Sequence, residues 1–183
     1  MFLFRNILAC GLLLAQTVGG VEWDCAETAG VFDRANDCEL GSTVYLTQSL
    51  TVNGRLQLTT IRAPSGARHF YVYKPEQVLT IRNLKLVGSG TAVGSHGGSV
   101  YAYLGTIIST ICWFHNNKAT KLGGTIYSHS SRITLVNTNI TDSTGTTSYS
   151  AQGSAGGGAL YAYKSTLSFM GGKLSGNEAA VYR

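Results

Sequence analysis

The sequence predicts an all-β protein folded as a parallel β-helix, and three observations lead to this prediction. A five-residue phrase, Gly-Gly-x-(Val/Ile/Leu)-Tyr, occurs three times, starting at Gly97, Gly123 and Gly157. Between these phrases apolar residues recur at alternate positions, which is typical of strands that bury one face. From Ser42 onward no stretch has the 3.6-residue period of a helix. A phrase that restarts at this interval indicates stacked repeat units.

The first 20 residues have the features of a secretory signal peptide. Arg5 supplies a positive charge, residues 7–15 are apolar, and Val18, Gly19 and Gly20 are small residues suited to cleavage before Val21. The apolar run is shorter than a membrane-spanning helix requires. We therefore expect residues 1–20 to be removed and the rest to be secreted or to lie at the cell surface, with no membrane span.

Residues 21–41 are expected to form an N-terminal cap, with a short helix or a loop over residues 26–37. Solenoids need an atypical unit at each end, because the first layer would otherwise be open to solvent. Cys25 and Cys38 are expected to form a disulfide, since an exported chain meets an oxidising compartment. Such a cross-link stabilises a fold by roughly 3 kcal/mol in the chain-entropy model. Cys112 is left over and is expected to point inward and be buried.

Residues 42–183 divide into units when a tyrosine is taken as the reference of each. In the four units that begin at Tyr73, Tyr101, Tyr127 and Tyr161, an apolar residue follows the tyrosine by six residues, and another follows it by thirteen. Each unit therefore holds about three short strands, and the chain is predicted to form five to six coils, incomplete at the C-terminus. The reference tyrosines are Tyr45, Tyr73, Tyr101, Tyr127, Tyr161 and Tyr182.

Two other repeat or all-β folds fit the sequence less well. Leucine-rich repeats have units of similar length but require a Leu-x-x-Leu-x-Leu pattern, which this chain lacks. A β-sandwich shows turns every 8–12 residues, a shorter period than that of the phrase. A single unit of three short strands cannot bury its own inner face, whereas a stack of such units can.

Two segments resemble the repeats of polymorphic outer-membrane proteins, which are large adhesive autotransporters. These segments are Gly157-Gly158-Ala159-Leu160 and Phe114-His115-Asn116-Asn117. The resemblance covers roughly residues 70–183. It implies a right-handed parallel β-helix of the pectin-lyase-like type and a role in surface adhesion.

The reference tyrosines are the candidate ligand-binding residues. Each follows an apolar residue, for example Val100 or Ile126, that is the better candidate for the inner face. Because side chains alternate along a strand, the tyrosines should point outward and stack about 4.8 Å apart. They then form a platform for sugar rings, or they merely stabilise neighbouring strands by stacking. The predicted binding residues are Tyr73, Tyr101, Tyr127 and Tyr161, widened by Tyr103 and Tyr163.

Charge indicates the class of partner. From Leu40 to the C-terminus the chain has 12 Lys and Arg but only 3 acidic residues, whereas residues 21–39 are acidic. A basic body favours anionic partners, unless the charges serve solubility alone. We expect an anionic polysaccharide or cell-surface glycan, no nucleic acid and no cofactor.

Catalysis is the alternative to binding. Enzymes on such folds that cleave acidic polysaccharides use several carboxylates to bind calcium or to act as acid and base. The body offers only Glu76, Asp142 and Glu178, at different positions within their units. We therefore expect no catalytic residues, with a polysaccharide lyase or hydrolase as the runner-up.

Histidines, threonines and one asparagine bear on three further kinds of site. The four histidines have no metal-ligand spacing, so we expect surface or edge residues and no metal site. Ice binding, which flat threonine-rich faces support, is disfavoured because Thr134 and its neighbours do not recur in adjacent units. Asn139-Ile140-Thr141 is an N-glycosylation sequon, and Asn139 should point outward because Ile140 points inward.

Overall fold

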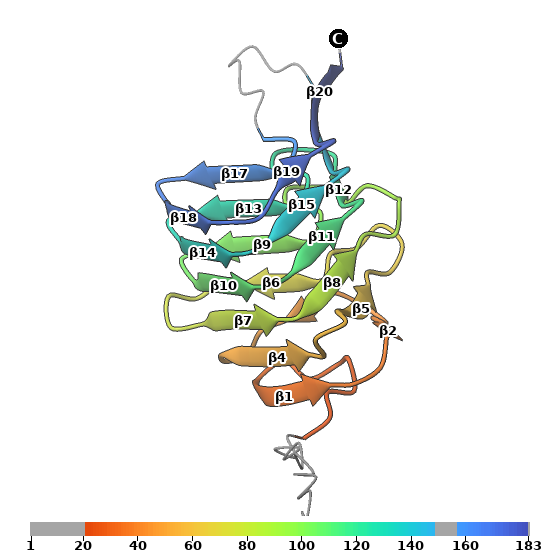
Figure 1. The fold of residues 1–183 in the computed structure, drawn as a ribbon. Helices are drawn as coiled ribbons and strands as arrows, with labels where there is room; N and C mark the ends of the chain where they lie inside the picture. The colour runs from red at the N-terminus through yellow and green to blue at the C-terminus, as the bar shows by residue number, and fades with distance from the viewer. Residues whose placement is uncertain (1–20, 149–156, 183) are drawn as a thin grey trace, which may run out of the picture.

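A computed structural model describes residues 21–148 and 157–182, so the predicted signal peptide lies outside the described residues. This part of the chain contains no helix, and its strands form four parallel sheets (Figure 1). The prediction of an all-β protein with parallel sheets is confirmed. We call the strands contributed by one repeat unit a layer.

The strands of the four sheets are as follows. Sheet A contains β1 (Gly30–Arg34), β4 (Leu50–Gly54), β7 (Val78–Arg82), β10 (Thr106–Thr110), β14 (Arg132–Val136) and β18 (Thr166–Met170). Sheet B contains β2 (Cys38–Glu39), β5 (Thr59–Arg62), β8 (Leu84–Val87), β11 (Trp113–His115), β15 (Asn139–Thr141) and β19 (Leu174–Ser175). Sheet C contains β3 (Val44–Tyr45), β6 (Phe70–Val72), β9 (Val100–Tyr103), β13 (Ile126–His129) and β17 (Leu160–Tyr163). Sheet D contains β12 (Lys118–Ala119), β16 (Thr144–Ser148) and β20 (Glu178–Tyr182).

Strands pair with their equivalents in the preceding and following layers, as Figure 1 shows from β1 upward. In sheet A, Ile107 pairs with Leu79 below and Ile133 above. In sheet B, Phe114 pairs with Leu86 and with Ile140. These six side chains are buried, which confirms the predicted positions six and thirteen residues after the reference tyrosine. Sheet D adds a fourth short strand to the later units.

The N-terminal segment contains strands, so the alternative of a helix over residues 26–37 is wrong. β1 pairs with β4 and β2 pairs with β5, so sheets A and B begin inside the segment predicted as a cap. Trp23 is fully buried, with its ring centroid 6.0 Å from that of Phe70. The segment therefore closes the lower end of the core.

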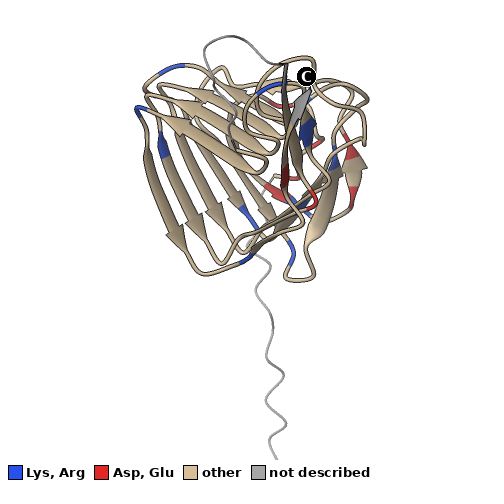
Figure 2. Cartoon of the chain, turned by 90° about the horizontal axis from the view of Figure 1, so that it is seen from above, with Lys and Arg blue, Asp and Glu red and all other residues tan. Residues whose placement is uncertain are grey.

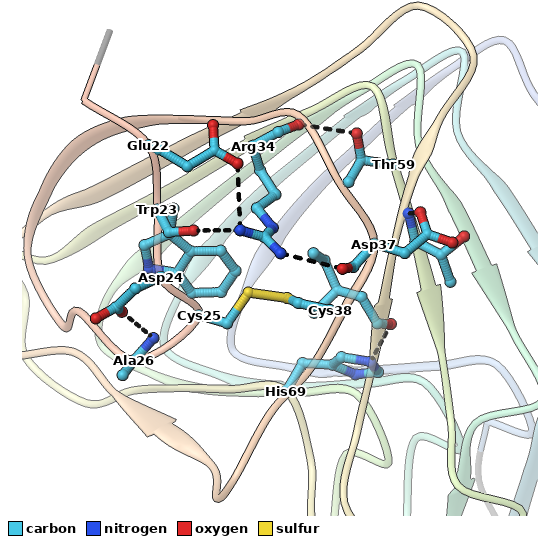
Figure 3. The surroundings of a disulfide bond; sticks show 12 residues. Glu22, Trp23, Asp24, Cys25, Ala26, Arg34, Asp37, Cys38, Thr59 and His69 are labelled. Carbon is cyan, nitrogen blue, oxygen red and sulfur yellow. Dashed lines mark hydrogen bonds and ion pairs between the residues drawn. A yellow bond between two sulfur atoms is a disulfide. The ribbon is translucent and has the colours of Figure 1, made fainter.

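The predicted disulfide between Cys25 and Cys38 is confirmed (Figure 3). It joins Cys25, two residues after the buried Trp23, to Cys38 at the start of β2. Arg34 lies beside it and donates hydrogen bonds to the carbonyl oxygens of Trp23 and Asp37, at 2.9 and 3.0 Å. The cross-link and Arg34 together hold the N-terminal segment against the first layer. The leftover thiol, Cys112, is buried as predicted.

The tyrosine register differs from the prediction at Tyr73. Tyr71, not Tyr73, pairs with Tyr101 above and with Tyr45 below. The turn from sheet C to sheet A is two residues longer here than in the next layer, and it is closed by the buried side chain of Gln77. The side-chain oxygen Oε1 of Gln77 accepts hydrogen bonds from the backbone amides of Tyr73 and Lys74, at 2.9 and 3.2 Å.

Tyr182 also differs from the prediction, because it does not begin a new unit of the tyrosine column. It pairs with Ser148 in sheet D. Tyr182 comes eight residues after Leu174 of sheet B. Ser148 likewise comes eight residues after Ile140, the residue that pairs with Leu174. That length reaches sheet D but stops short of sheet C. The 34-residue unit is eight residues longer than the unit before it, and the extra residues follow Thr144. Residues 149–156 lie outside the described residues.

Candidate ligand-binding face

The outer face of sheet C carries a column of five tyrosines, one from each strand. Their ring centroids are separated by 4.7 to 5.5 Å, and most neighbouring rings are nearly parallel. The apolar residue before each ring points inward, and Val100 and Ile126 are fully buried. The tyrosines thus point outward as expected. The column consists of Tyr45, Tyr71, Tyr101, Tyr127 and Tyr161.

A second aromatic column lies two residues further along each strand. The ring of His129 lies between those of Tyr103 and Tyr163, with centroid distances of 5.0 and 5.1 Å. Tyr73 belongs to this column, since the residue before it pairs with Ala102. Tyr73, Tyr103 and Tyr163 are each at least 40% exposed. The six predicted binding residues therefore lie on one face, but in two columns. Sequence reasoning missed Tyr71 as a member of that face, and it gave no binding role to His129.

Stacking decides which part of each ring a ligand can reach. Tyr101 lies 4.7 Å from Tyr71 and 5.1 Å from Tyr127, so both of its faces are covered by neighbouring rings. Open faces remain only at the ends of the first column, as at Tyr45, which lines a cleft of about 330 Å³. Along the middle, the column presents ring edges and phenol hydroxyls.

These hydroxyls are free to bind a ligand. None of the tyrosine hydroxyls on sheet C has a hydrogen-bond partner among the described residues, and none of them is buried without one. Burial, reinforced by neighbouring tyrosines, raises the pKa of Tyr101 and Tyr127. Both phenols therefore stay protonated at neutral pH, where each can donate and accept a hydrogen bond.

Cationic groups lie against the edges of the aromatic face. The Lys74 ammonium lies 5.5 Å from the Tyr73 ring centroid, and the Lys164 ammonium lies 5.3 Å from that of Tyr163. Arg68 covers Tyr71 and Tyr101. Basic residues are otherwise spread around the stack, as the view along its axis shows (Figure 2). Cations thus lie on aromatic rings at this face, as Lys85 does on sheet B, where its ammonium lies 4.1 Å from the Trp113 ring centroid.

The three acidic residues considered for catalysis are divided between two corners. Glu76 lies in the turn between sheets C and A. Asp142 lies two residues before Thr144, which pairs with Glu178, so these two acids share a corner one layer apart. An Asp142 carboxylate oxygen lies 3.2 Å from Nδ1 of His115. This arrangement brings together two of the three carboxylates.

His69 is not at the surface, so the prediction of surface or edge histidines is wrong for this residue. It is fully buried between layers, with Nε2 3.1 Å from the carbonyl oxygen of Ile61 and Nδ1 2.9 Å from the hydroxyl of Ser99. Nε2 therefore donates to the carbonyl and Nδ1 accepts from the hydroxyl. Burial lowers the pKa of His69 from 6.5 to about 4. Ser99 is also fully buried, so the pair stabilises the fold and is closed to substrates.

This burial predicts loss of stability in acid. A neutral histidine whose pKa falls on folding stabilises the folded state fully above its unfolded pKa of 6.5, and that contribution is lost as the pH falls toward about 4. The shift corresponds to about 3 kcal/mol. Urea unfolding at pH 7.5 and 4.5 should show this loss in the native protein, and a smaller one in His69→Gln.

Equal acid losses in the two proteins would contradict this account. If His69→Gln does not fold, titration of His69 in the native protein still tests the predicted pKa. An NMR titration that places the His69 ring pKa near 6.5 would overturn it.

Two outward positions on the other sheets bear on the remaining predictions. Asn139 is exposed at the start of β15, so the sequon points outward as predicted, beside Trp113 of the layer below. On sheet A, Thr51, Thr80 and Thr134 share one outer column, interrupted by Ile108. Thr134 itself pairs with Ile108 in the layer below and with Ser168 in the layer above, so the expectation that it does not recur in adjacent units is confirmed.

Within the described ranges, no three His, Cys, Asp or Glu side chains are grouped as a metal site would require. None of the described segments is a helix with the length and apolar character needed to cross a membrane. Comparison of the chain with protein-family models, with curated proteins and with solved structures found no match.

Proposed function

We propose that the protein is a secreted or cell-surface module that binds an acidic polysaccharide or extracellular-matrix glycan without catalysis. Its fold is proposed to be a right-handed parallel β-helix of five to six coils. Parallel pairing of each strand with its equivalents one layer away supports this fold. The resemblance of residues 70–183 to the adhesive polymorphic outer-membrane protein repeats supports both the handedness and the adhesive role.

The observation that carries the proposal is the row of unpartnered phenol hydroxyls on sheet C. Neighbouring rings of the column are about one strand spacing apart, so hydroxyls recur along the stack at that interval. A linear polysaccharide presents hydroxyl groups at regular intervals along an extended chain. It can therefore lie along the column and bond to successive phenols, while its carbon–hydrogen edges contact the ring edges. The net positive charge favours a polyanionic chain.

Secretion is supported by the disulfide, since disulfides persist in oxidising compartments. The signal-peptide features of residues 1–20 agree with it. Asn139 is the proposed glycosylation site, and it lies on sheet B, away from the aromatic face.

Replacing hydroxyls while keeping the rings tests the proposal. Tyr101→Phe/Tyr127→Phe is expected to weaken binding of a fluorescein-labelled acidic polysaccharide about tenfold, because two hydrogen bonds of about 0.5–1.5 kcal/mol are lost. Fluorescence anisotropy measures the dissociation constant. The matched control is Thr134→Val, which removes an outward hydroxyl from sheet A and should leave affinity unchanged.

Two outcomes would contradict the proposal. One is unchanged affinity in the double variant, or no binding of any acidic polysaccharide tested. The other is the release of new reducing or unsaturated ends from the polysaccharide, abolished by Asp142→Asn or Glu178→Gln, which would favour the lyase or hydrolase alternative.

A further inference from the structure

Four polar residues meet at the corner that precedes sheet C, beside the first tyrosine column. We call Arg68, Ser95, His96 and Lys121 the corner cluster. They come from the turns that precede β6, β9 and β13 and so belong to three successive layers. The side chains of Arg68 and His96 cover the tyrosine column from one side, and this places the cluster next to the phenol row.

Arg68 is a buried cation without a counterion. Its guanidinium carbon lies 5.6 Å from the Tyr71 ring centroid and 5.3 Å from that of Tyr101, and only 8% of the residue is exposed. Nη2 donates to the hydroxyl of Ser95 at 2.6 Å, but Nη1 has no hydrogen-bond partner. All nine acidic residues of the chain are among the described residues, and Arg68 forms an ion pair with none of them. Buried charges are normally paired, so this one is incomplete.

His96 supplies a second donor at the same corner. Its ring stacks on Tyr127 with centroids 4.5 Å apart, and its Nδ1 accepts the amide hydrogen of Leu122 at 3.2 Å. The proton of the neutral ring is therefore on Nε2, which has no partner among the described residues. Burial, followed by the charges of Lys121 and Arg68, lowers the pKa of His96. Lys121 is exposed, and its ammonium forms no ion pair with a described residue. It is the third hydrogen-bond donor of the cluster.

The geometry points to a specific ligand group: the corner cluster binds the anionic oxygens of an acidic sugar, a carboxylate or a sulfate ester, whose chain lies along Tyr101 and Tyr127. This assignment rests on the proposed function and names the residues that recognise the negative charge of the ligand. Guanidinium and imidazole N–H groups make short, charge-assisted hydrogen bonds to such oxygens. An anion here would also neutralise the uncompensated charge of Arg68.

Matched ligands and matched lysines test the assignment. The probes are a fluorescein-labelled oligogalacturonide, its fully methyl-esterified form and a heparin fragment of similar length, with affinity measured by anisotropy. The native protein should bind a carboxylate or sulfate probe at least tenfold more tightly than the ester. Lys121→Gln and His96→Gln should each reduce that preference at least threefold, whereas Lys173→Gln, which removes an exposed lysine beside sheet B, should leave it unchanged.

Arg68→Lys keeps the charge but loses the planar donor geometry, and it should reduce the same preference while the protein stays folded by circular dichroism. Preference for the oligogalacturonide assigns the site to carboxylates, and preference for heparin assigns it to sulfates. Equal binding of acid and ester, still weakened by Tyr101→Phe/Tyr127→Phe, would overturn the corner cluster but leave the proposed function standing. Failure of all three probes to bind would overturn both.

Discussion

Gly124→Ala is expected to abolish stable folding, with a loss of more than about 4 kcal/mol in the free energy of unfolding. Gly124 is the second glycine of its phrase, at the corner between sheets D and C. A Cβ atom there would collide with the carbonyl oxygen of Gly158 in the next layer and would lie 2.5 Å from the carbonyl carbon of Thr144. These are backbone atoms held by the stacked strands, so the layers would have to separate to admit a methyl group.

The matched control is Gly94→Ala, because a Cβ atom at Gly94 meets nothing within 4 Å and its backbone needs no left-handed conformation. We expect this variant to remain within about 0.5 kcal/mol of the native protein. Urea unfolding followed by circular dichroism measures both. A folded Gly124→Ala protein that loses less than about 1 kcal/mol would show that the close approach of the layers at this corner is not required.

Leu79→Ala should cost 2–5 kcal/mol, while Leu167→Ala should cost well under that. Both leucines occupy the same inward column of sheet A, as their shared alignment with Ile107 and Ile133 shows. Leu79 is fully buried between layers, whereas Leu167 is 42% exposed in the last described layer of that sheet. The side chain, column and substitution are the same in the two variants. The difference between their losses in unfolding free energy therefore measures the stability gained when a further layer covers the leucine.

Chemical denaturation of the two variants tests this expectation directly. The native protein and Leu79→Ala should differ in the denaturant midpoint without a large change in slope. Equal losses for the two leucines would mean that Leu167 is covered in solution. The same measurement on Leu174→Ala, 49% exposed in sheet B, would then show whether the whole upper end is covered.

The inward positions of the strands were predictable because burial imposes the same pattern on every layer. Residues such as Ile107 and Phe114 recur at fixed distances from a tyrosine, and each is buried against its equivalents. The outward direction of Tyr101 and Tyr127 follows from the same alternation. Local spacing carries this information, so no knowledge of distant contacts is needed.

The register at Tyr71 was not predictable in the same way. Tyr71 and Tyr73 are two residues apart and both follow an alternating pattern, so either could serve as the reference. The choice depends on Gln77, whose side-chain amide donates to the carbonyl oxygen of Leu46, 31 residues earlier, at 2.6 Å. Contacts of this kind are formed only after the layers have stacked. The burial of His69, which depends on Ile61 and Ser99, belongs to the same class.

The all-β repeat, the Cys25–Cys38 disulfide and the outward face of the tyrosines could all be predicted from the sequence. The mutual covering of the ring faces, and the position of Arg68 on Tyr71 and Tyr101 without a counterion, became visible only in the folded structure. The physical reason is the scale of the interactions. Alternation along one strand selects the buried face, but turn lengths set the register between layers, and each site on this protein is assembled from residues in different layers.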